Sequence, residues 1–144
     1  MNTQVEIYQN QDKLPLSESL IERMTAAANA AIPLVSKLAV DGEVLSQLEL
    51  VEVSIVDDET IAQVHVDFMD IPGATDVITF DYGEIVVSVE TAKSQALEYG
   101  NEFERELMLY VIHGLMHLAG HEDADPAEAA VMAQGQESVL AEVW

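Results

Sequence analysis

The chain has 144 residues, and 49% of them are hydrophobic and spread along its whole length, which indicates a folded protein and excludes a disordered one. Its 27 acidic and five basic residues give a formal net charge of −22, so the surface as a whole repels phosphate backbones and anionic lipids. The absence of cysteine excludes disulfides, thiolate metal ligands and cysteine nucleophiles.

The first part of the chain predicts a strand and then a long helix. Residues 5–8 alternate apolar and polar side chains, as a half-buried strand does. Ser17 is a suitable N-cap for an Ala-rich helix that runs to Ala31 or beyond. Pro33 is expected to kink that helix or restart it.

The middle of the chain predicts three more strands. Residues 48–56 alternate with a period of two and are rich in β-branched side chains, and a short helix capped at residues 57–58 should follow. After a turn at residues 71–73, two strands at 75–80 and 84–89 are separated by only three residues. So short a connection favours an antiparallel hairpin.

Three helices are expected in the remainder. The first covers about residues 91–99. Asn101, with a glutamate three residues later, has the form of a capping box for a helix that ends near Leu118. Asp125, followed by a proline, predicts the start of a last helix that continues close to Trp144.

These elements predict a single α+β domain over residues 1–144, with a mixed sheet of about four strands, one antiparallel hairpin and about five helices packed against the sheet. The N-terminus has no basic segment followed by an apolar run, and no apolar run approaches the roughly 18 residues of a membrane span. We therefore expect a cytoplasmic protein with no membrane partner.

Two histidines carry the strongest chemical signal in the sequence. His113 and His117 are four residues apart in a predicted helix, so both side chains project from one face. Two imidazoles at that spacing can bind one Zn²⁺, and other divalent transition metals fit the same ligands. Ordinary half-buried histidines are the alternative, but both lie in the apolar segment VIHGLMHLAG, where an unpaired imidazole is costly.

Gly120 should turn the chain back toward these histidines. Glycine adopts the left-handed conformation that ends many helices without a steric penalty. The reversal would bring one of His121, Glu122 and Asp123 to the metal as a third ligand. Three protein ligands and one open position are typical of a catalytic site. The H-E-x-x-H pattern of zinc peptidases is absent, because Gly114 stands where the glutamate would be.

The segment HGLMHLAGHED resembles the signature of the YbeY family, H-G-x-L-H-L-x-G-Y-D-H, in which three histidines bind zinc. The residues that match in place are His113, Gly114, His117, Leu118 and Gly120. Two segments beside the signature are similar as well: residues 75–85 resemble the family's Thr-Asp strand and the Gly-Asp-Ile after it, and residues 128–132 resemble its Glu-Ala-x-x-Met. The resemblance covers about residues 48–140.

This resemblance implies a metal-dependent endoribonuclease that hydrolyses RNA phosphodiesters in ribosomal RNA maturation. It also implies one Zn²⁺ per chain, an rRNA precursor as partner, and contacts with ribosomal proteins. Asp123 occupies the position of the family's third histidine, and His121 occupies that of its tyrosine. We expect Asp123 to be the third ligand, because the spacing is kept and carboxylate binds zinc; His121 is the alternative.

A second departure concerns the family's Leu-Asn-x-x-Tyr-Arg motif, which residues 64–69 match in position. His65 replaces the asparagine, and Met69 replaces the arginine, a bidentate phosphate donor. His65 is either a solvent-facing helix residue or a residue of the catalytic cleft.

Further catalytic candidates are Glu122 and Arg105. Glu122 is the nearest carboxylate that is not an expected ligand, which makes it a candidate general base. Arg105 lies about two helical turns before His113 and could meet a flanking phosphate, or form a surface ion pair with Glu102.

Two other functions fit the same sequence. One is a non-catalytic, ribosome-associated metal-binding factor, whose acidic surface meets basic ribosomal proteins. The other is a metal-dependent hydrolase of a substrate that is not a nucleic acid. The missing arginine and the net charge favour the first of these, whereas the open metal position favours an enzyme.

Overall fold

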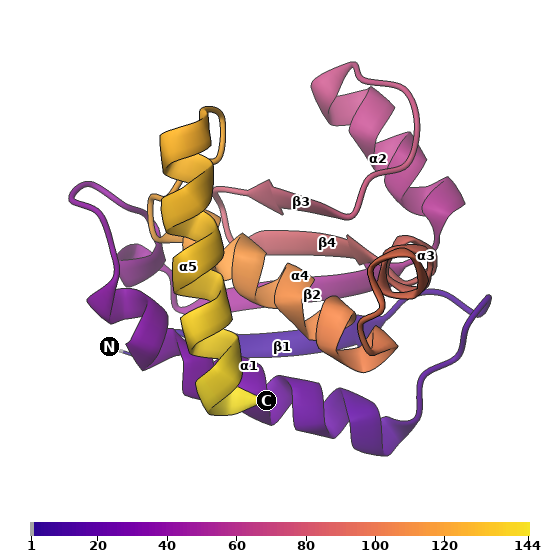
Figure 1. Cartoon of the computed structure of the whole chain (residues 1–144), viewed down its shortest axis with the longest axis horizontal. Helices are drawn as coiled ribbons and strands as arrows, with labels where there is room; N and C mark the ends of the chain where they lie inside the picture. Colours follow the sequence, from indigo (N-terminus) through magenta and orange to yellow (C-terminus); the bar gives the residue numbers. More distant parts are fainter. Residues whose placement is uncertain (1) are drawn as a thin grey trace.

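The structure, a computed structural model, describes residues 2–144 and contains one four-stranded sheet within that range (Figure 1). The strand order is β1-β2-β4-β3. The two pairs β1/β2 and β2/β4 are parallel, whereas β3 and β4 form an antiparallel hairpin at one edge. This confirms the predicted mixed sheet. The strands are β1 (Gln4–Gln9), β2 (Leu50–Val56), β3 (Val77–Phe80) and β4 (Glu84–Ser88).

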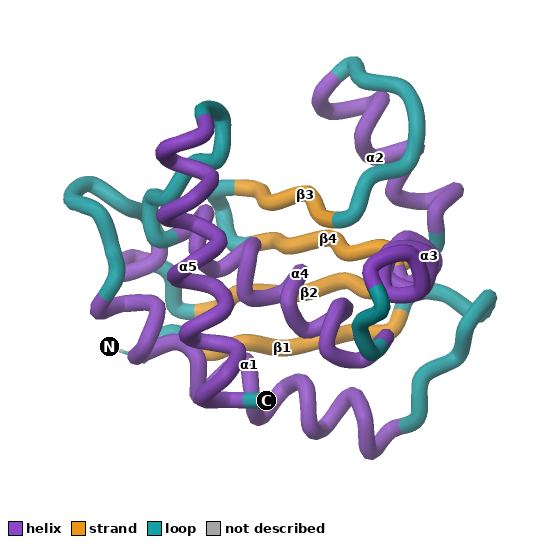
Figure 2. The backbone as a smooth tube through the Cα atoms, viewed as in Figure 1, coloured by secondary structure: helices purple, strands orange, loops and turns teal. Residues whose placement is uncertain are grey.

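The sheet is accompanied by five α-helices within the described residues, as the sequence predicts. Figure 2 shows α4 and α1 running along one side of the sheet, with α5 over them. Helix α2 stands beside β3 and β4 and packs on the opposite side, so that it covers only that part of the second face. The helices are α1 (Glu18–Lys37), α2 (Asp58–Met69), α3 (Val89–Tyr99), α4 (Phe103–Leu118) and α5 (Pro126–Val143), and a short 3₁₀ helix spans Leu45–Gln47.

Side-chain caps begin three of the helices where the sequence places them, and one expected cap is wrong. Ser17, Asp57 and Asp125 each accept a hydrogen bond from a backbone N–H in the first turn of the helix that follows. Asn101 does not cap α4, and its backbone N–H donates to the carbonyl of Ala96 at the end of α3. The N-cap of α4 is the next residue, and its side chain makes no capping bond.

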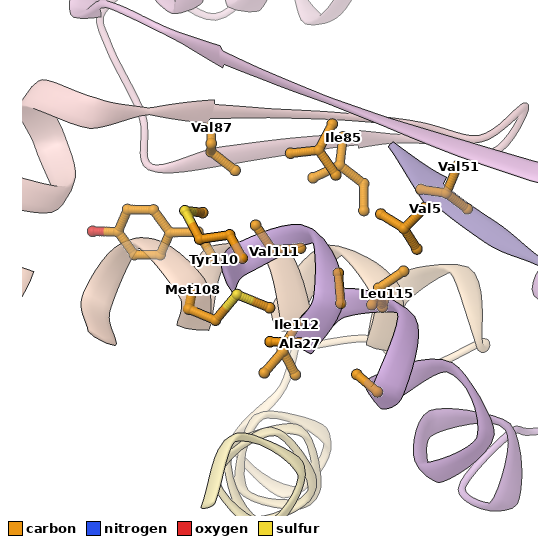
Figure 3. Packing of buried hydrophobic residues seen from close by; sticks show 14 of the residues in the cluster. Val5, Ala27, Val51, Ile85, Val87, Met108, Tyr110, Val111, Ile112 and Leu115 are labelled. Carbon is orange, nitrogen blue, oxygen red and sulfur yellow. The ribbon is translucent and has the colours of Figure 1, made fainter. Parts of the chain in front are cut away.

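Helix α1 does not restart at Pro33, because it is continuous from Glu18 to Lys37. The core between the sheet and the helices explains why. Side chains from α1, such as Ala27, pack against those of α4 and the strands, and this tertiary packing holds the helix across the proline (Figure 3).

Helix α4 lies unusually close to the sheet at Gly114. A Cβ built on this glycine would fall 2.7 Å from two side-chain atoms of Ile85 on β4, closer than carbon atoms approach in proteins. Both residues belong to the buried surface between α4 and the sheet. The close approach sets the distance between α4 and β4. It therefore also sets the position of the two histidines, which lie on either side of Gly114 in the helix.

The face of the sheet that α2 leaves open carries a row of carboxylates. Glu6, Glu52 and Glu84 are register partners on β1, β2 and β4, so they lie side by side across three strands. The hydroxyls of Tyr8 and Tyr82 donate to the two outer members, Glu6 and Glu84. We call Glu6, Glu52 and Glu84 the glutamate row.

Within residues 2–144, no helix is both long enough and apolar enough to cross a lipid bilayer.

Candidate metal centre

The two histidines of α4 point their Nε2 atoms at each other. The Nε2 atoms of His113 and His117 are 3.1 Å apart, and the ring centroids are 4.7 Å apart with the rings nearly perpendicular. Both side chains are partly buried at the end of α4 that lies nearest to β3 and β4. The expected shared face of the helix therefore has both imidazole nitrogens directed at a common point.

Gly120 makes the predicted reversal with a φ of +96°. Its N–H donates to the carbonyl of His117, and the N–H of His121 donates to that of Met116, which closes the end of the helix. The segment that follows returns over the histidines. It places Oδ2 of Asp123 at 3.4 Å from Nε2 of His113 and 3.9 Å from Nε2 of His117.

His121 is directed elsewhere. Its Nε2 lies 2.6 Å from the carbonyl oxygen of Leu38, to which the ring N–H can donate. The residue lies against Val40 and Val131 in a separate surface pocket that does not include the α4 histidines. The geometry thus groups His113 and His117 with Asp123 and leaves His121 outside the group.

These three side chains fit a tetrahedral metal ion. Ligand atoms bound at about 2.0–2.1 Å in tetrahedral geometry lie roughly 3.3 Å from one another. The observed separations of 3.1, 3.4 and 3.9 Å lie around that value. Among the residues that the structure describes, His113, His117 and Asp123 form the one group of three potential ligands close enough to share an ion.

Gln136 on α5 fixes the orientation of His113. Its Oε1 lies 2.8 Å from Nδ1 of His113, and because a carbonyl oxygen only accepts, Nδ1 carries the hydrogen. The lone pair of this imidazole is then on Nε2, which is the nitrogen that faces His117 and Asp123. Histidine ligands commonly donate their second N–H to such a partner.

The surroundings of His117 favour its neutral form. Burial lowers the pKa of its imidazole, and the nearby His113 lowers it further, while the carboxylates of Asp123 and Glu122 act in the opposite direction. A neutral imidazole is the form that binds a metal ion, so the local environment favours the ligand-competent state.

The three potential ligands line a cavity of about 500 Å³ that is open to solvent. Two of the predicted catalytic residues, His65 and Glu122, line the same cavity. Nδ1 of His65 lies 3.0 Å from the carbonyl oxygen of Gly73, which anchors the ring to the loop after α2. The remaining lining residues are Met69, Thr75, Asp76, Val77, Ile78, Thr79 and Asp81.

Arg105 lies outside this cavity. Its guanidinium forms an ion pair with Glu137 on α5, rather than with Glu102 as the sequence suggested. Within residues 2–144, no lysine or arginine lines the cavity, whereas four carboxylates do. Without a metal ion, the cavity therefore has no strong attraction for a phosphate.

Sequence reasoning missed the contribution of Gln136 and of β3. Gln136 lies 23 residues after His113, on a different helix, and no local pattern connects the two. Thr79 and Asp81 reach the cavity because β3 is the edge strand beside α4, which depends on the order of strands in the sheet. The similarity of residues 75–80 to a family motif was the one signal that pointed to this strand.

Comparison with known proteins gives one consistent result. Residues 6–143 match the family model described as "Endoribonuclease YbeY". A relative of that name from Desulfitobacterium hafniense is 32% identical over 65% of this chain and 71% of its own length. Another, from Myxococcus xanthus, is 37% identical over 68% of this chain but only 39% of its own length. A solution structure of a Thermotoga maritima protein superimposes with a TM-score of 0.64, at 28% identity, over 97% of this chain and 89% of that one.

Proposed function

Since this chain belongs to the YbeY family, we propose that it is a metal-dependent endoribonuclease that hydrolyses RNA phosphodiesters during ribosomal RNA maturation. We further propose that the metal is one Zn²⁺ ion, with His113, His117 and Asp123 as its ligands and residues 1–144 as one domain. The ligand set departs from the family pattern at one position, where Asp123 replaces a zinc-binding histidine.

One observation carries the proposal more than any other. Three ligand atoms converge at tetrahedral spacing on the wall of a cavity that is open to solvent. A structural zinc site is usually closed by four protein ligands, whereas a catalytic site keeps one position for water or substrate. The arrangement here supplies three protein ligands and free space beside them.

A bound zinc ion would supply a Lewis acid that polarises a phosphoryl oxygen and acidifies a bound water. Glu122 lines the cavity next to the ligand Asp123, where its carboxylate can accept the proton of an attacking water. His65 lies on the same cavity and donates its Nδ1–H to the carbonyl of Gly73, so its Nε2 carries a lone pair that can accept a hydrogen bond from a water or a hydroxyl of the RNA. The charge of Asp123 makes the site less positive than a three-histidine site by one unit, which favours a less acidic bound water.

The residues around the site and the net charge of the chain limit how it can bind RNA and proteins. Met69 lines the cavity where an arginine stands in the family motif, so the chain offers no bidentate phosphate donor there. The net charge of −22 suits contact with basic ribosomal proteins, which we propose as partners in the cytoplasm together with an rRNA precursor.

The test is cleavage of a structured rRNA fragment by the zinc-loaded protein, compared with Glu122→Gln and His113→Ala. We expect wild-type cleavage to stop on chelation and to return with zinc. Glu122→Gln should retain zinc and lose most activity, because removing a general base costs roughly 10²- to 10⁴-fold. Glu142→Gln, at the exposed end of α5, is the matched control and should cleave normally. Bound zinc without RNA cleavage would replace this proposal with a non-catalytic ribosome-associated factor.

A further inference from the structure

An open pocket at the start of α4 contains two of the few basic residues of the chain. It has a volume of about 320 Å³ and is formed by the loop before α1, by α3 and by the first turn of α4. Its lining residues are Lys13, Leu14, Pro15, Leu16, Lys93 and Phe103, and we call these six residues the lysine pocket. The lysine pocket is separate from the metal centre, because Phe103 begins α4 and His113 lies roughly 15 Å further along the helix axis.

The floor of the lysine pocket is apolar. Leu14, Leu16 and Phe103 are partly buried and pack against the main core, while their outer sides line the pocket. Leu97 extends this apolar surface, because it lies one helical turn after Lys93 on the same side of α3. It is 85% exposed, the highest value among the large apolar side chains that the structure describes. Neighbouring exposed apolar groups of this kind mark an interaction surface.

Both arginines of the chain are engaged by other residues. The guanidinium of Arg23 lies 3.7 Å from the ring centroid of Trp144 and donates to the carbonyl of the same residue. Arg105 forms an ion pair with Glu137. The other three of the five basic residues are lysines, and two of them line the lysine pocket. A chain with a net charge of −22 thus places two of its three lysines beside one apolar surface.

The ammonium groups of these two lysines are available to a ligand. Nζ of Lys13 lies 3.8 Å from Oδ2 of Asp57, a long ion pair, and half of the lysine side chain is exposed. Within residues 2–144, Lys93 has no carboxylate at ion-pair distance. Exposed ion pairs contribute little to stability, so Lys13 can exchange its partner at small cost.

We propose that the lysine pocket, together with Leu97, binds an acidic peptide segment of a partner protein, in which large apolar side chains lie between carboxylates. The apolar side chains cover Leu97 and the pocket floor, and the carboxylates pair with Lys13 and Lys93. The net charge of −22 repels such a segment from the rest of the surface and so directs it to this place. The inference adds a partner site to the proposed function without depending on it, because the lysine pocket and the metal-centre cavity share no lining residue.

The extent and composition of the surface favour a peptide over a small anion or a nucleic acid. Leu97 is not among the lining residues of the pocket, so an occupant that covers it must extend beyond the pocket itself. A small anion could pair with the lysines but would leave this leucine uncovered. The floor is mainly aliphatic, whereas single-stranded nucleic acids stack their bases on aromatic rings.

The experiment is a titration of the ¹⁵N-labelled full-length chain with the synthetic peptide acetyl-Asp-Glu-Leu-Phe-Glu-Asp-amide, followed through the backbone amide signals. An ionic strength of about 0.15 M screens the repulsion between charges more than roughly 8 Å apart. We expect saturable shifts at Leu14, Lys93 and Phe103, and none at His113 and His117. A peptide with serine in place of leucine and phenylalanine should bind at least about 10-fold more weakly, because it buries less apolar surface.

Two substitutions of exposed side chains test the two parts of the contact. Lys93→Glu should weaken binding at least about 10-fold, because repulsion replaces attraction. Leu97→Ala should weaken it roughly 3- to 30-fold, because less apolar surface is buried. Lys37→Glu changes the net charge equally but lies at the end of α1, outside the pocket, and Val131→Ala shortens an exposed side chain on α5. Both of these controls should bind the peptide as the wild type does.

The inference is overturned if the wild type shows no saturable shift at the lysine pocket, or if Lys93→Glu and Leu97→Ala bind as the wild type does. Equal binding of the serine peptide would also overturn it, because the response would then be to anions in general. Shifts at His113 and His117 instead, or larger shifts of the pocket amides with single-stranded RNA, would likewise overturn it. Zinc-dependent RNA cleavage by Lys93→Glu should equal that of the wild type, so the failure of one proposal is visible without the other.

Discussion

Oε1 of Gln136 lies 2.8 Å from Nδ1 of His113, so a residue of α5 determines which nitrogen of His113 faces the metal centre. We predict that Gln136→Leu lowers zinc affinity roughly 10- to 100-fold, as the loss of an outer hydrogen-bond partner does at other metal sites. Competition with a chromophoric chelator measures the change. Gln136→Glu keeps an acceptor at this position and should restore most of the affinity.

Gln134→Leu is the control for that comparison, because Gln134 is exposed on the same helix. Nitrogen NMR of the metal-free protein adds a readout that a general loss of stability does not reproduce. The wild type should show the Nδ1–H tautomer of His113, and Gln136→Leu a mixture of tautomers. An unchanged tautomer and an unchanged zinc affinity would contradict the assigned role.

The choice between Asp123 and His121 as third ligand is tested by removing each in turn. We predict that Asp123→Ala weakens zinc binding by more than the roughly 100-fold expected for an outer partner, because a direct ligand is lost. His121→Ala should leave zinc affinity nearly unchanged, since that ring contacts the carbonyl of Leu38 instead. Isothermal titration with zinc measures both, and the reverse order would exclude Asp123 as the ligand.

Because α4 and β4 are closely packed at Gly114, we expect a single added methyl group there to lower the stability of the fold substantially. Gly114→Ala would place Cβ 2.7 Å from side-chain atoms of Ile85 and should lower the free energy of unfolding by about 1–3 kcal/mol. Urea denaturation measures the loss, and Ile85→Ala should relieve part of it, so the double variant is less destabilised than the sum of the two single ones. Gly135→Ala is a useful comparison, because its Cβ would clash only with the terminal methyl group of Met116, the far end of a flexible side chain.

Alkaline titration should reveal the contact between Tyr82 and the glutamate row. The hydrogen bond to Glu84 raises the pKa of Tyr82 to about 12, with smaller effects from burial and from the charges of Glu84 and Glu52. The folded protein holds this proton more tightly than the unfolded chain. Its contribution to stability is therefore present below pH 10 and is lost as the pH rises through about 12. Absorbance at 295 nm should show a tyrosine titrating in that range, and Tyr82→Phe should remove it.

His117 should titrate below the ordinary histidine range in the metal-free protein. Burial and the proximity of His113 lower its pKa, so the unfolded chain binds this proton more tightly than the folded one. Its contribution to stability is present above about pH 6.5 and is lost as the pH falls through the lowered value. Proton NMR of the imidazole signals measures the pKa, with His117→Asn to assign the signal. A value at or above 6.5 would contradict the burial argument.

Local sequence patterns predicted the elements well, because the signals for them lie within a few residues. The alternation in β2 and the helix start at Asp125 are examples, and both are present. The N-cap predicted at Asn101 is wrong because α4 begins one residue later, with Glu102 as its N-cap, a boundary that the local pattern does not show. The predicted restart of the helix at Pro33 is wrong for a related reason: tertiary packing of α1 outweighs the local cost of a proline.

The candidate site, too, contains contacts that the sequence predicts and contacts that it does not. His113 and His117 meet because both belong to one helix, and Gly120 brings Asp123 to them through a short turn. These contacts are short-range, so spacing predicts the pair of histidines and the return of one of residues 121–123, whereas the family resemblance singled out Asp123. Gln136 and the edge strand β3 are brought to the site by the packing of separate elements, which no spacing rule encodes.

The glutamate row has a consequence for the protein in concentrated solution. An open sheet face offers a flat surface on which a second copy could stack, and aligned charges of one sign prevent this as long as they are ionised. The carboxylates that repel one another within a single copy thus also keep separate copies apart.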